Sequence, residues 1–113
     1  MSTIKNSVKL IGNAGNDPEI RTFSNGQKVA RVRIAVNESY KNANGEWVQQ
    51  TQWFPLSGFG NVADRMEKTI RKGVYFAIDG RLHNNEWDDE HGRHSVTEII
   101  VNDLFLIDTQ KRQ

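Results

Sequence analysis

Alternation of apolar and polar residues is the clearest signal along this chain. Residues 28–37 place apolar side chains on one parity and Arg31 and Arg33 on the other; the apolar ones are Ala30, Val32, Ile34 and Val36. Successive side chains of a strand point to opposite faces, so this segment predicts a strand with one buried and one basic face. A shorter alternation at Val8 and Leu10 predicts an earlier strand.

Turn signals separate the remaining elements. NDP at 16–18, SNGQ at 24–27 and KNANGE at 41–46 predict turns, the last a hairpin tip. Residues 47–59, 74–82 and 96–108 predict three further strands, and the polar residues 84–93 are expected to form a loop carrying Trp87. Pro55 cannot donate a ladder hydrogen bond, which predicts a strand edge or bulge there.

One helix is predicted at residues 62–72. Val62, Met66 and Ile70 form an apolar stripe, Asn61 is the expected N-cap, and Gly73 is expected to end the helix. The expected ion pairs are Asp64 with Lys68 and Glu67 with Arg71. Five strands with one helix between the third and fourth predict a mainly all-β, five-stranded OB-fold Greek-key barrel, although a generic α+β sandwich would give a similar pattern.

The segment TQWFPLSGFG at 51–60 suggests a binding surface. If Phe54 and Leu56 face the core, alternation leaves Trp53 and Phe59 together on the solvent side. Large exposed aromatic rings are typical of a surface on which something stacks. The alternative is that both rings belong to the core.

Composition narrows the class of protein. A chain of 113 residues predicts one domain, assigned to residues 1–108 with a short polar tail at 109–113. The net charge is only +1, but Lys and Arg gather in residues 1–41 and Asp and Glu in residues 79–108. The absence of cysteine and of an apolar leader favours a cytoplasmic protein.

No catalytic motif stands out. His91 and His94 lie among acidic residues, but their spacing in a polar loop, without cysteine, is typical of a loop tip rather than a metal site. We therefore expect no enzyme activity, no metal and no cofactor.

Several motifs together resemble the bacterial single-stranded DNA-binding protein family. They are VKLIGNAGNDPEIR at 8–21, NGQKVARVRIAVNESY at 25–40, GEWVQQTQW at 45–53, KGVYFAIDGRL at 72–82, W-D-x-x-x-G at 87–92 and TEIIVND at 97–103. The resemblance spans residues 4–107. It implies an OB-fold that binds exposed single strands in replication, repair and recombination, without catalysis.

The resemblance also implies which residues contact DNA. Residues matching Trp53, Phe59, Trp87 and Tyr40 stack on bases in this family, with Tyr40 standing where Trp is common. Trp47 shares the parity of Trp53 and could extend the stacking surface, or could simply pack within its hairpin. The phosphate-contact candidates, for each of which an ordinary solvated surface role is equally open, are Lys9, Arg21, Arg31, Arg33, Lys72 and Arg81.

Partners follow from the same resemblance. It implies self-association, as a homotetramer or a dimer, with Phe54 near a subunit contact. Family members are basic just before the residue matching Trp87, whereas here Glu86, Asp88, Asp89 and Glu90 surround it. The acidic C-terminal tip through which many relatives recruit partner proteins is expected to be absent. The alternative function is an OB-fold adaptor that acts mainly through protein contacts in a replication-restart complex.

Overall fold

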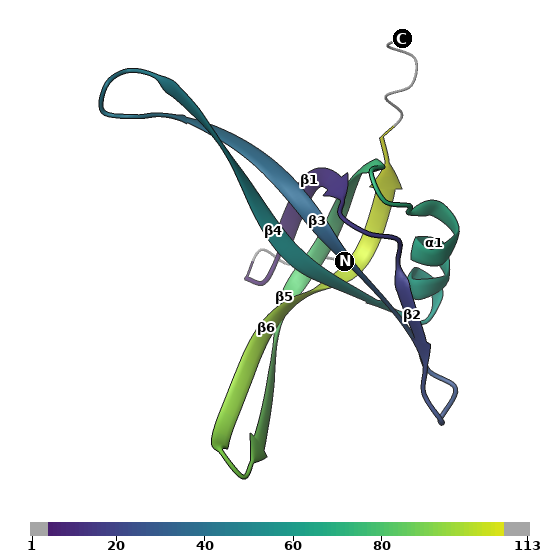
Figure 1. Cartoon of the computed structure of the whole chain (residues 1–113). Coiled ribbons are helices and arrows are strands. Elements are labelled where there is room, and N and C mark those ends of the chain that lie inside the picture. The colour runs from purple at the N-terminus through teal and green to yellow at the C-terminus, as the bar shows by residue number, and fades with distance from the viewer. Residues whose placement is uncertain (1–4, 108–113) are drawn as a thin grey trace.

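The structure is a small barrel from which two long hairpins project. The computed structural model describes residues 5–107, so the predicted tail at 109–113 lies outside the described residues. The strands are β1 (Val8–Ala14), β2 (Glu19–Thr22), β3 (Lys28–Lys41), β4 (Trp47–Phe59), β5 (Tyr75–Asp89) and β6 (Gly92–Leu106), and the helix α1 spans Asn61–Thr69. Figure 1 shows the β3–β4 hairpin and the β5–β6 hairpin leaving the barrel in different directions.

Five of the six strands close the barrel. The sheet order is β1-β5-β6-β4-β3-β2, and β1 also pairs with β3 at Asn13 and Ala14. Gly12 permits this closure, because a Cβ there would lie 2.1 Å from the carbonyl oxygen of Ala35. β2 adds to the outer edge of β3, and α1 lies between β4 and β5 in the chain. The predicted OB-fold barrel is confirmed, with β2 as a short strand that the sequence pattern did not separate.

The barrel core forms where the alternating apolar residues meet α1. Ile34, Leu56, Met66, Ile70 and Phe76 are among its most completely buried side chains. The buried positions of β3 are therefore those that alternation predicted, and Met66 and Ile70 face inward from α1 and its C-cap.

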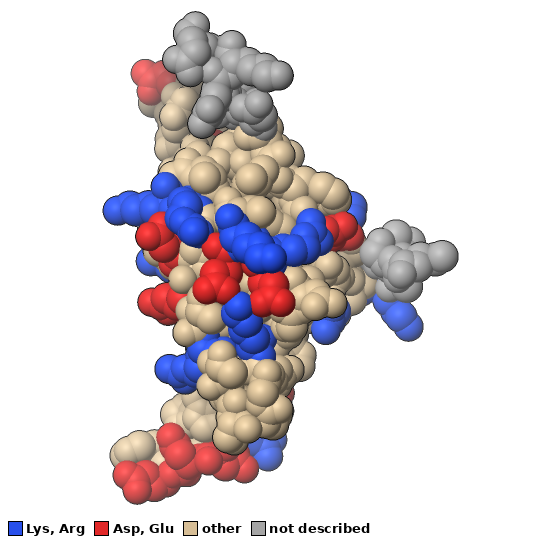
Figure 2. Space-filling view, turned by 90° about the vertical axis from the view of Figure 1, so that its right-hand side faces the viewer, with Lys and Arg blue, Asp and Glu red and all other residues tan. Residues whose placement is uncertain are grey.

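Both ends and the ion pairs of α1 differ from expectation. The helix ends at Thr69, with Ile70 as its C-cap, and not at Gly73. Gly60, not Asn61, is the N-cap, and no side chain caps the helix. The Lys28 ammonium bonds both Asp64, at 2.7 Å, and Glu67. A cation from β3 thus takes the place of the predicted partners within the helix, since the start of β3 lies against this face of α1. Figure 2 shows the basic side chains around α1 and the acidic end of the β5–β6 hairpin at the bottom.

The largest correction concerns residues 84–93. They form the ends of β5 and β6 and the turn between them, not a loop. The paired strands continue to Asp89 opposite Gly92. Both faces of this hairpin are largely exposed, so its side chains show no apolar alternation.

Pro55 lies where its missing N–H is harmless. The N–H and C=O of Arg33, its partner on β3, bond to Asn16 and Gly15 instead of to β4. Arg33 and Pro55 therefore exchange no ladder hydrogen bonds, and the backbone nitrogen of Pro55 points away from β3. On its other side β4 pairs with β6 only at Leu56 and Ser57. This places Pro55 at an open strand edge, as predicted.

Within residues 5–107 no helix has the length and apolarity needed to cross a membrane.

Candidate functional site

One face of the β3–β4 hairpin carries exposed aromatic rings among basic side chains. We call it the Trp53 face; its members are Arg31, Arg33, Lys41, Trp47, Trp53 and Phe59. The register places Arg31 opposite Ser57, Arg33 opposite Pro55 and Lys41 opposite Trp47, so these residues share a face. Leu56 is buried on the other face, where Phe54 packs against the core.

Trp53 lies at the centre of this face. Its side chain is 48% exposed, and the Arg33 guanidinium carbon lies 4.9 Å from its ring centroid. The ring rests against Gly15, where a Cβ would lie 2.5 Å from ring atom Cζ3. Gly15 thus supports the ring from below and Arg33 contacts it, so the ring is held in place while much of its surface remains available for stacking.

The same pattern recurs along the hairpin. The Lys41 ammonium lies 5.5 Å from the ring centroid of Trp47, which is strongly exposed near the tip. At the other end of β4, Phe59 is 37% exposed. Exposed aromatic rings therefore lie near the tip, in the middle and at the base of the hairpin, and two of them have a cation beside them.

The β5–β6 hairpin continues the Trp53 face. Glu98 of β6 accepts hydrogen bonds from Ser57 Oγ, at 2.8 Å, and from the Asn85 amide. The groove between the two hairpins is lined by Arg31 and Arg33 on one side and by Asn85 on the other. Alternation along β5 then puts Trp87, two residues after Asn85, on this same continuous surface.

Trp87 is 48% exposed, but its surroundings differ from those of Trp53. Its ring stacks on His94, with centroids 5.5 Å apart and planes 25° apart. His94 Nε2 lies 2.9 Å from Asp89 Oδ1. A carboxylate therefore lies close to the stacked pair of rings.

Two of the acidic residues that flank Trp87 in the sequence belong to the opposite face of this hairpin. Glu86 lies opposite Ser95, and Asp88 lies opposite Arg93, whose Nε is 3.3 Å from Asp88 Oδ1. Alternation turns both away from Trp87. Within residues 5–107 no three His, Cys, Asp or Glu side chains converge as a metal site would require.

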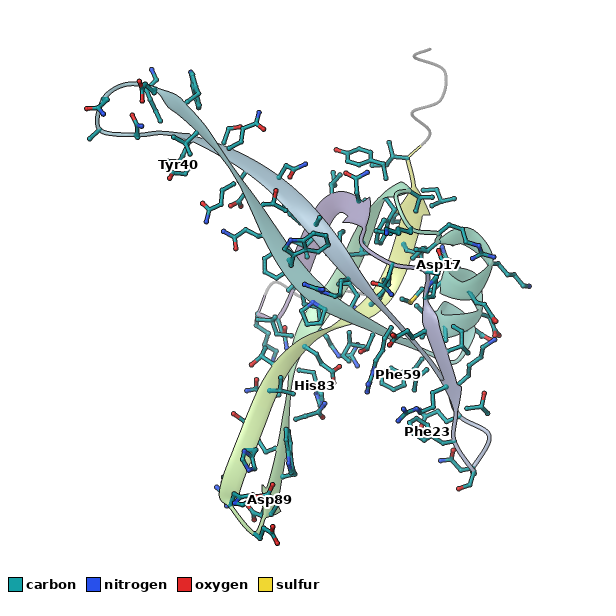
Figure 3. All side chains as sticks on the ribbon, viewed as in Figure 1. Asp17, Phe23, Tyr40, Phe59, His83 and Asp89 are labelled. Carbon is teal, nitrogen blue, oxygen red and sulfur yellow. The ribbon has the colours of Figure 1, made fainter. Side chains whose placement is uncertain are left out.

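Tyr40 lies on the face opposite Trp53. Its partner is Val48, and it shares the parity of Ile34 and Val36 on β3. Figure 3 shows Tyr40 near the far end of the β3–β4 hairpin and Phe59 at the opposite end of β4. The structure therefore brings Trp47, Trp53, Phe59 and Trp87 to one continuous surface and leaves Tyr40 on its reverse side.

The phosphate candidates divide in the same way. Arg21 pairs in register with Val29, which places it on the Trp53 face beside Arg31 and Arg33. Arg81 lies in one row with Ile100, Ser57 and Arg31, which places it on this surface too, where it donates to Asn102 Oδ1 at 2.6 Å. The remaining two lie elsewhere: Lys9 forms an ion pair with Asp79 at 3.0 Å, and Lys72 lies in the turn after α1, where its backbone N–H donates to Asp17.

Two features escaped sequence reasoning. Phe23, which is 41% exposed, lies just beyond β2 at the end of the Trp53 face. In the sequence Phe23 shares the strand parity of Arg21, but the turn signal directly after it makes the residue read as part of the turn. An apolar patch also covers the outside of the barrel, where Ile11 of β1, Ala77 of β5 and Phe105 of β6 lie in one row.

Comparison with known proteins places this geometry in a family. The family model described as "Single-strand binding protein family" matches residues 5–107. The chain belongs to this family. A curated relative, "Single-stranded DNA-binding protein 1" of Chlorobaculum tepidum, is 35% identical over 104 residues, which are 90% of this chain and 64% of the relative. The chain thus spans less than two thirds of that relative's length.

Solved structures support the fold assignment. A chain of the "Plasmodium falciparum SSB complex with ssDNA" matches with a TM-score of 0.81 and 32% identity, covering 96% of this chain and 97% of that one. A deletion mutant of the single-stranded DNA binding protein from Thermus aquaticus matches with a TM-score of 0.84 and 18% identity, covering 93% of this chain and 51% of that one. The second likeness bears on the fold alone.

Proposed function

We propose that this protein binds single-stranded DNA without sequence preference and protects it during replication, repair and recombination. The observation that carries the proposal is the Trp53 face, where Trp53 and Phe59 remain exposed beside Arg31 and Arg33. Every base has a π face, so stacking on such rings is worth about 1–3 kcal/mol per base whatever the base is. A protein that uses stacking can coat any sequence.

The basic side chains complete this mechanism. Arg21, Arg31 and Arg33 lie on the same face as the rings, where they would neutralise phosphates and release counterions. Binding needs no catalytic group, metal or cofactor in this mechanism. Family membership and the match over nearly the whole chain to a protein solved with single-stranded DNA also support it.

Intrinsic tryptophan fluorescence tests the proposal. Titration with oligo(dT) should quench the emission, and the logarithm of affinity should fall with the logarithm of salt concentration by about 0.7 per phosphate contacted. Oligo(dT) of two lengths and two salt concentrations would suffice. A protein that acts mainly as an adaptor through protein contacts would show neither quenching nor a salt-dependent affinity.

We also infer that copies of the chain associate, as a homotetramer or a dimer, through the outer face of β1, β5 and β6. Phe105 is 56% exposed there, in a row with Ile11 and Ala77. The other edge of β1 pairs with β3 only at Asn13 and Ala14, which leaves most of that edge open. An open edge beside an apolar patch favours a second copy as the covering partner.

Light scattering of Phe105→Asp tests this inference. The unmodified protein should be oligomeric at micromolar concentration, and Phe105→Asp should shift it toward the monomer, whereas Phe105→Leu should not. A monomeric unmodified protein would refute the inference. Phe54, for which an interface role stays a prediction, is a poorer test because it packs against the core and Phe54→Glu would destabilise the barrel itself.

A further inference from the structure

Phe23 is an exposed aromatic ring without an assigned role. It follows directly after β2, where its backbone N–H donates to Gln27 O at 2.8 Å across the turn into β3. This hydrogen bond continues the β2–β3 ladder by one pair beyond Thr22 and Lys28. The ring is therefore carried by ordered backbone, although much of it faces solvent.

The register places Phe23 next to the proposed DNA-binding surface. Arg21 lies opposite Val29 on β3, and Val29 lies opposite Phe59 on β4, so these three form one row across three strands. Phe23 is two residues beyond Arg21, which puts it on the same face in the next row. Figure 3 shows Phe23 and Phe59 at the same end of the molecule.

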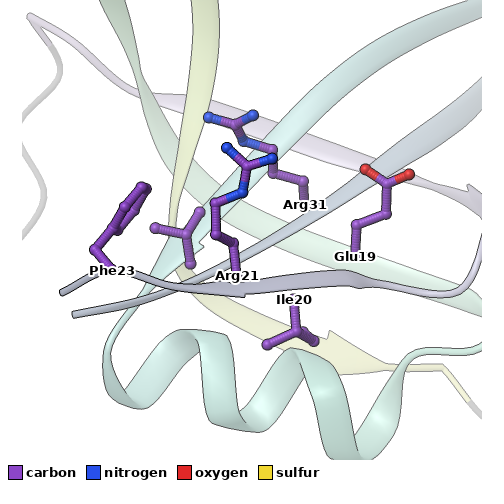
Figure 4. Close-up of a pocket in the computed structure, with 6 residues that line it drawn as sticks. Glu19, Ile20, Arg21, Phe23 and Arg31 are labelled. Carbon is purple, nitrogen blue, oxygen red and sulfur yellow. The ribbon is translucent and has the colours of Figure 1, made fainter. Parts of the chain in front are cut away.

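A hollow of about 310 Å³ lies beside Phe23. Its lining includes Phe23, Val29, Arg21, Arg31 and Glu19. Figure 4 shows the two arginines, Glu19 and Phe23 on one side of the β2 and β3 ribbons, whereas Ile20 points to the other side, toward α1. The hollow thus combines an aromatic wall with two guanidinium groups.

The charges of this hollow favour an anion. Among residues 5–107, Arg21 and Arg31 take part in no ion pair, so both guanidinium groups can donate hydrogen bonds to a phosphate. Glu19, opposite Arg31 in the register, is the carboxylate that a phosphate would approach. Two cations against one carboxylate leave the hollow with a net positive charge.

We propose that Phe23 is a further stacking site for a base of the single strand, with the adjoining phosphate held between Arg21 and Arg31. This inference rests on the proposed function and extends its path beyond Phe59, around the edge of the barrel onto β2. Trp53 and Phe59 are six residues apart on β4, about 20 Å along a strand. A single-stranded DNA that stacks on both Trp53 and Phe59 would have to be longer still to reach Phe23.

The test is a series of oligo(dT) lengths, from about 4 to 16 nucleotides. Phe23→Ala should bind the shortest oligonucleotides as the unmodified protein does, because these can bind at Trp53 and Phe59. On the longest ones it should lose affinity by about 5- to 150-fold, the fold-change that corresponds to one stacked base. Phe23→Trp should retain the affinity for long oligonucleotides and increase the fluorescence quenching by them.

Two further variants serve as controls. Thr22→Ala alters the neighbouring exposed residue on the opposite face of β2 and should bind every length normally. Phe23→Leu keeps an apolar side chain but removes the π face, so it should lose affinity as Phe23→Ala does. The Tm of each variant should stay close to that of the unmodified protein.

Three outcomes would overturn the inference in distinguishable ways. Unchanged affinity of Phe23→Ala at every length removes Phe23 from the path, while the loss on Trp53→Ala would still support the proposed function. Normal affinity of Phe23→Leu would mean that the side chain only packs against its neighbours. Failure of the unmodified protein to bind any oligonucleotide would refute the proposed function together with this extension.

Discussion

Each of the two long hairpins carries an exposed tryptophan in contact with another side chain, but the charged residues of the β3–β4 hairpin are mainly basic and those of the β5–β6 hairpin mainly acidic. In each, an exposed tryptophan lies against a nitrogen-containing side chain: Trp53 against Arg33 in the β3–β4 hairpin and Trp87 against His94 in the β5–β6 hairpin. Residues 28–59 hold four Lys and Arg against two Glu, whereas residues 75–106 hold two Arg against seven Asp and Glu. Among the described residues Arg33 forms no ion pair, so its guanidinium is available to a phosphate, whereas His94 lies against the Asp89 carboxylate.

This difference teaches that exposure of a ring does not by itself define a DNA contact. Trp53 and Trp87 are equally exposed, at 48% each. A phosphate that follows a stacked base would meet guanidinium groups beside Trp53 but a carboxylate beside Trp87. We therefore expect the β3–β4 hairpin to supply most of the binding free energy and the β5–β6 hairpin a smaller share.

The largest expected effect is that of Trp53→Ala. It should weaken oligo(dT) binding by about 1–3 kcal/mol, because one stacked base is lost, while Trp87→Ala should cost less. The Tm should change little, since the ring is half exposed. Equal losses for the two variants would remove the contrast between the hairpins.

Tyr40→Ala is the matched control on the same hairpin. Tyr40 lies on the reverse face, so we expect its removal to leave the affinity unchanged. The resemblance to the family instead implies that it stacks on a base. A loss as large as that of Trp53→Ala would mean that the strand passes over both faces of the hairpin.

The next effect concerns the salt dependence of binding. Arg33→Met should lower the slope of log affinity against log salt by about 0.7, the value for one phosphate contact on a single strand. Lys9→Met is the matched control, since Lys9 pairs with Asp79 on the outer face of the barrel. Titrations at three salt concentrations give both slopes, and an equal change in the two would mean that only net charge matters.

A smaller effect should distinguish the two faces of the β5–β6 hairpin. Asp89→Asn removes the carboxylate beside Trp87 and should tighten binding at low salt, by no more than about 1 kcal/mol for an exposed charge. Glu86→Gln removes the same charge from the opposite face and should change the affinity less. Equal tightening would indicate a general effect of net charge. Tightening that persists at 1 M salt, where exposed charges are screened within about 3 Å, would mean that the effect is not electrostatic.

Sequence alternation was sufficient wherever one face of a strand is buried. It separated Trp53 and Phe59 from Phe54 and Leu56, because the core residues on β4 mark the parity. The same rule places Tyr40 with Ile34 and Val36, on the reverse of the Trp53 face. The barrel and its helix could therefore be predicted from local pattern and element order.

The remaining features depend on contacts that local pattern does not contain. The β5–β6 hairpin was mistaken for a loop because its distal residues are exposed on both faces, so nothing selects an alternating pattern. The partner of Asp64 was also wrong, because Lys28 is 36 residues away in sequence. Its proximity follows from the packing of β3 on α1.

The smallest effects concern how α1 holds the base of each hairpin. Lys28 joins the start of β3 to Asp64 and Glu67, and Arg65 Nη1 lies 2.6 Å from Asp103 Oδ1 of β6. The hydrogen bond from Lys28 lowers the pKa of Asp64. Hydrogen bonds from Arg65 and from the Leu104 backbone N–H lower the pKa of Asp103 in the same way.

These lowered pKa values give the stability a defined pH dependence. A carboxylate whose pKa is lower in the folded state stabilises the fold at pH values above its unfolded pKa, which is near 3.8 for both groups. That stability is lost as the pH falls through the lower folded pKa values. We expect Asp64→Asn with Asp103→Asn to reduce the Tm slightly at pH 7 and to flatten its decline below about pH 4. The same double variant at pH 7 should leave oligo(dT) affinity unchanged, because both pairs lie away from the Trp53 face. If affinity fell with the Tm, the ion pairs of α1 would be needed to hold the β3–β4 hairpin in its binding position.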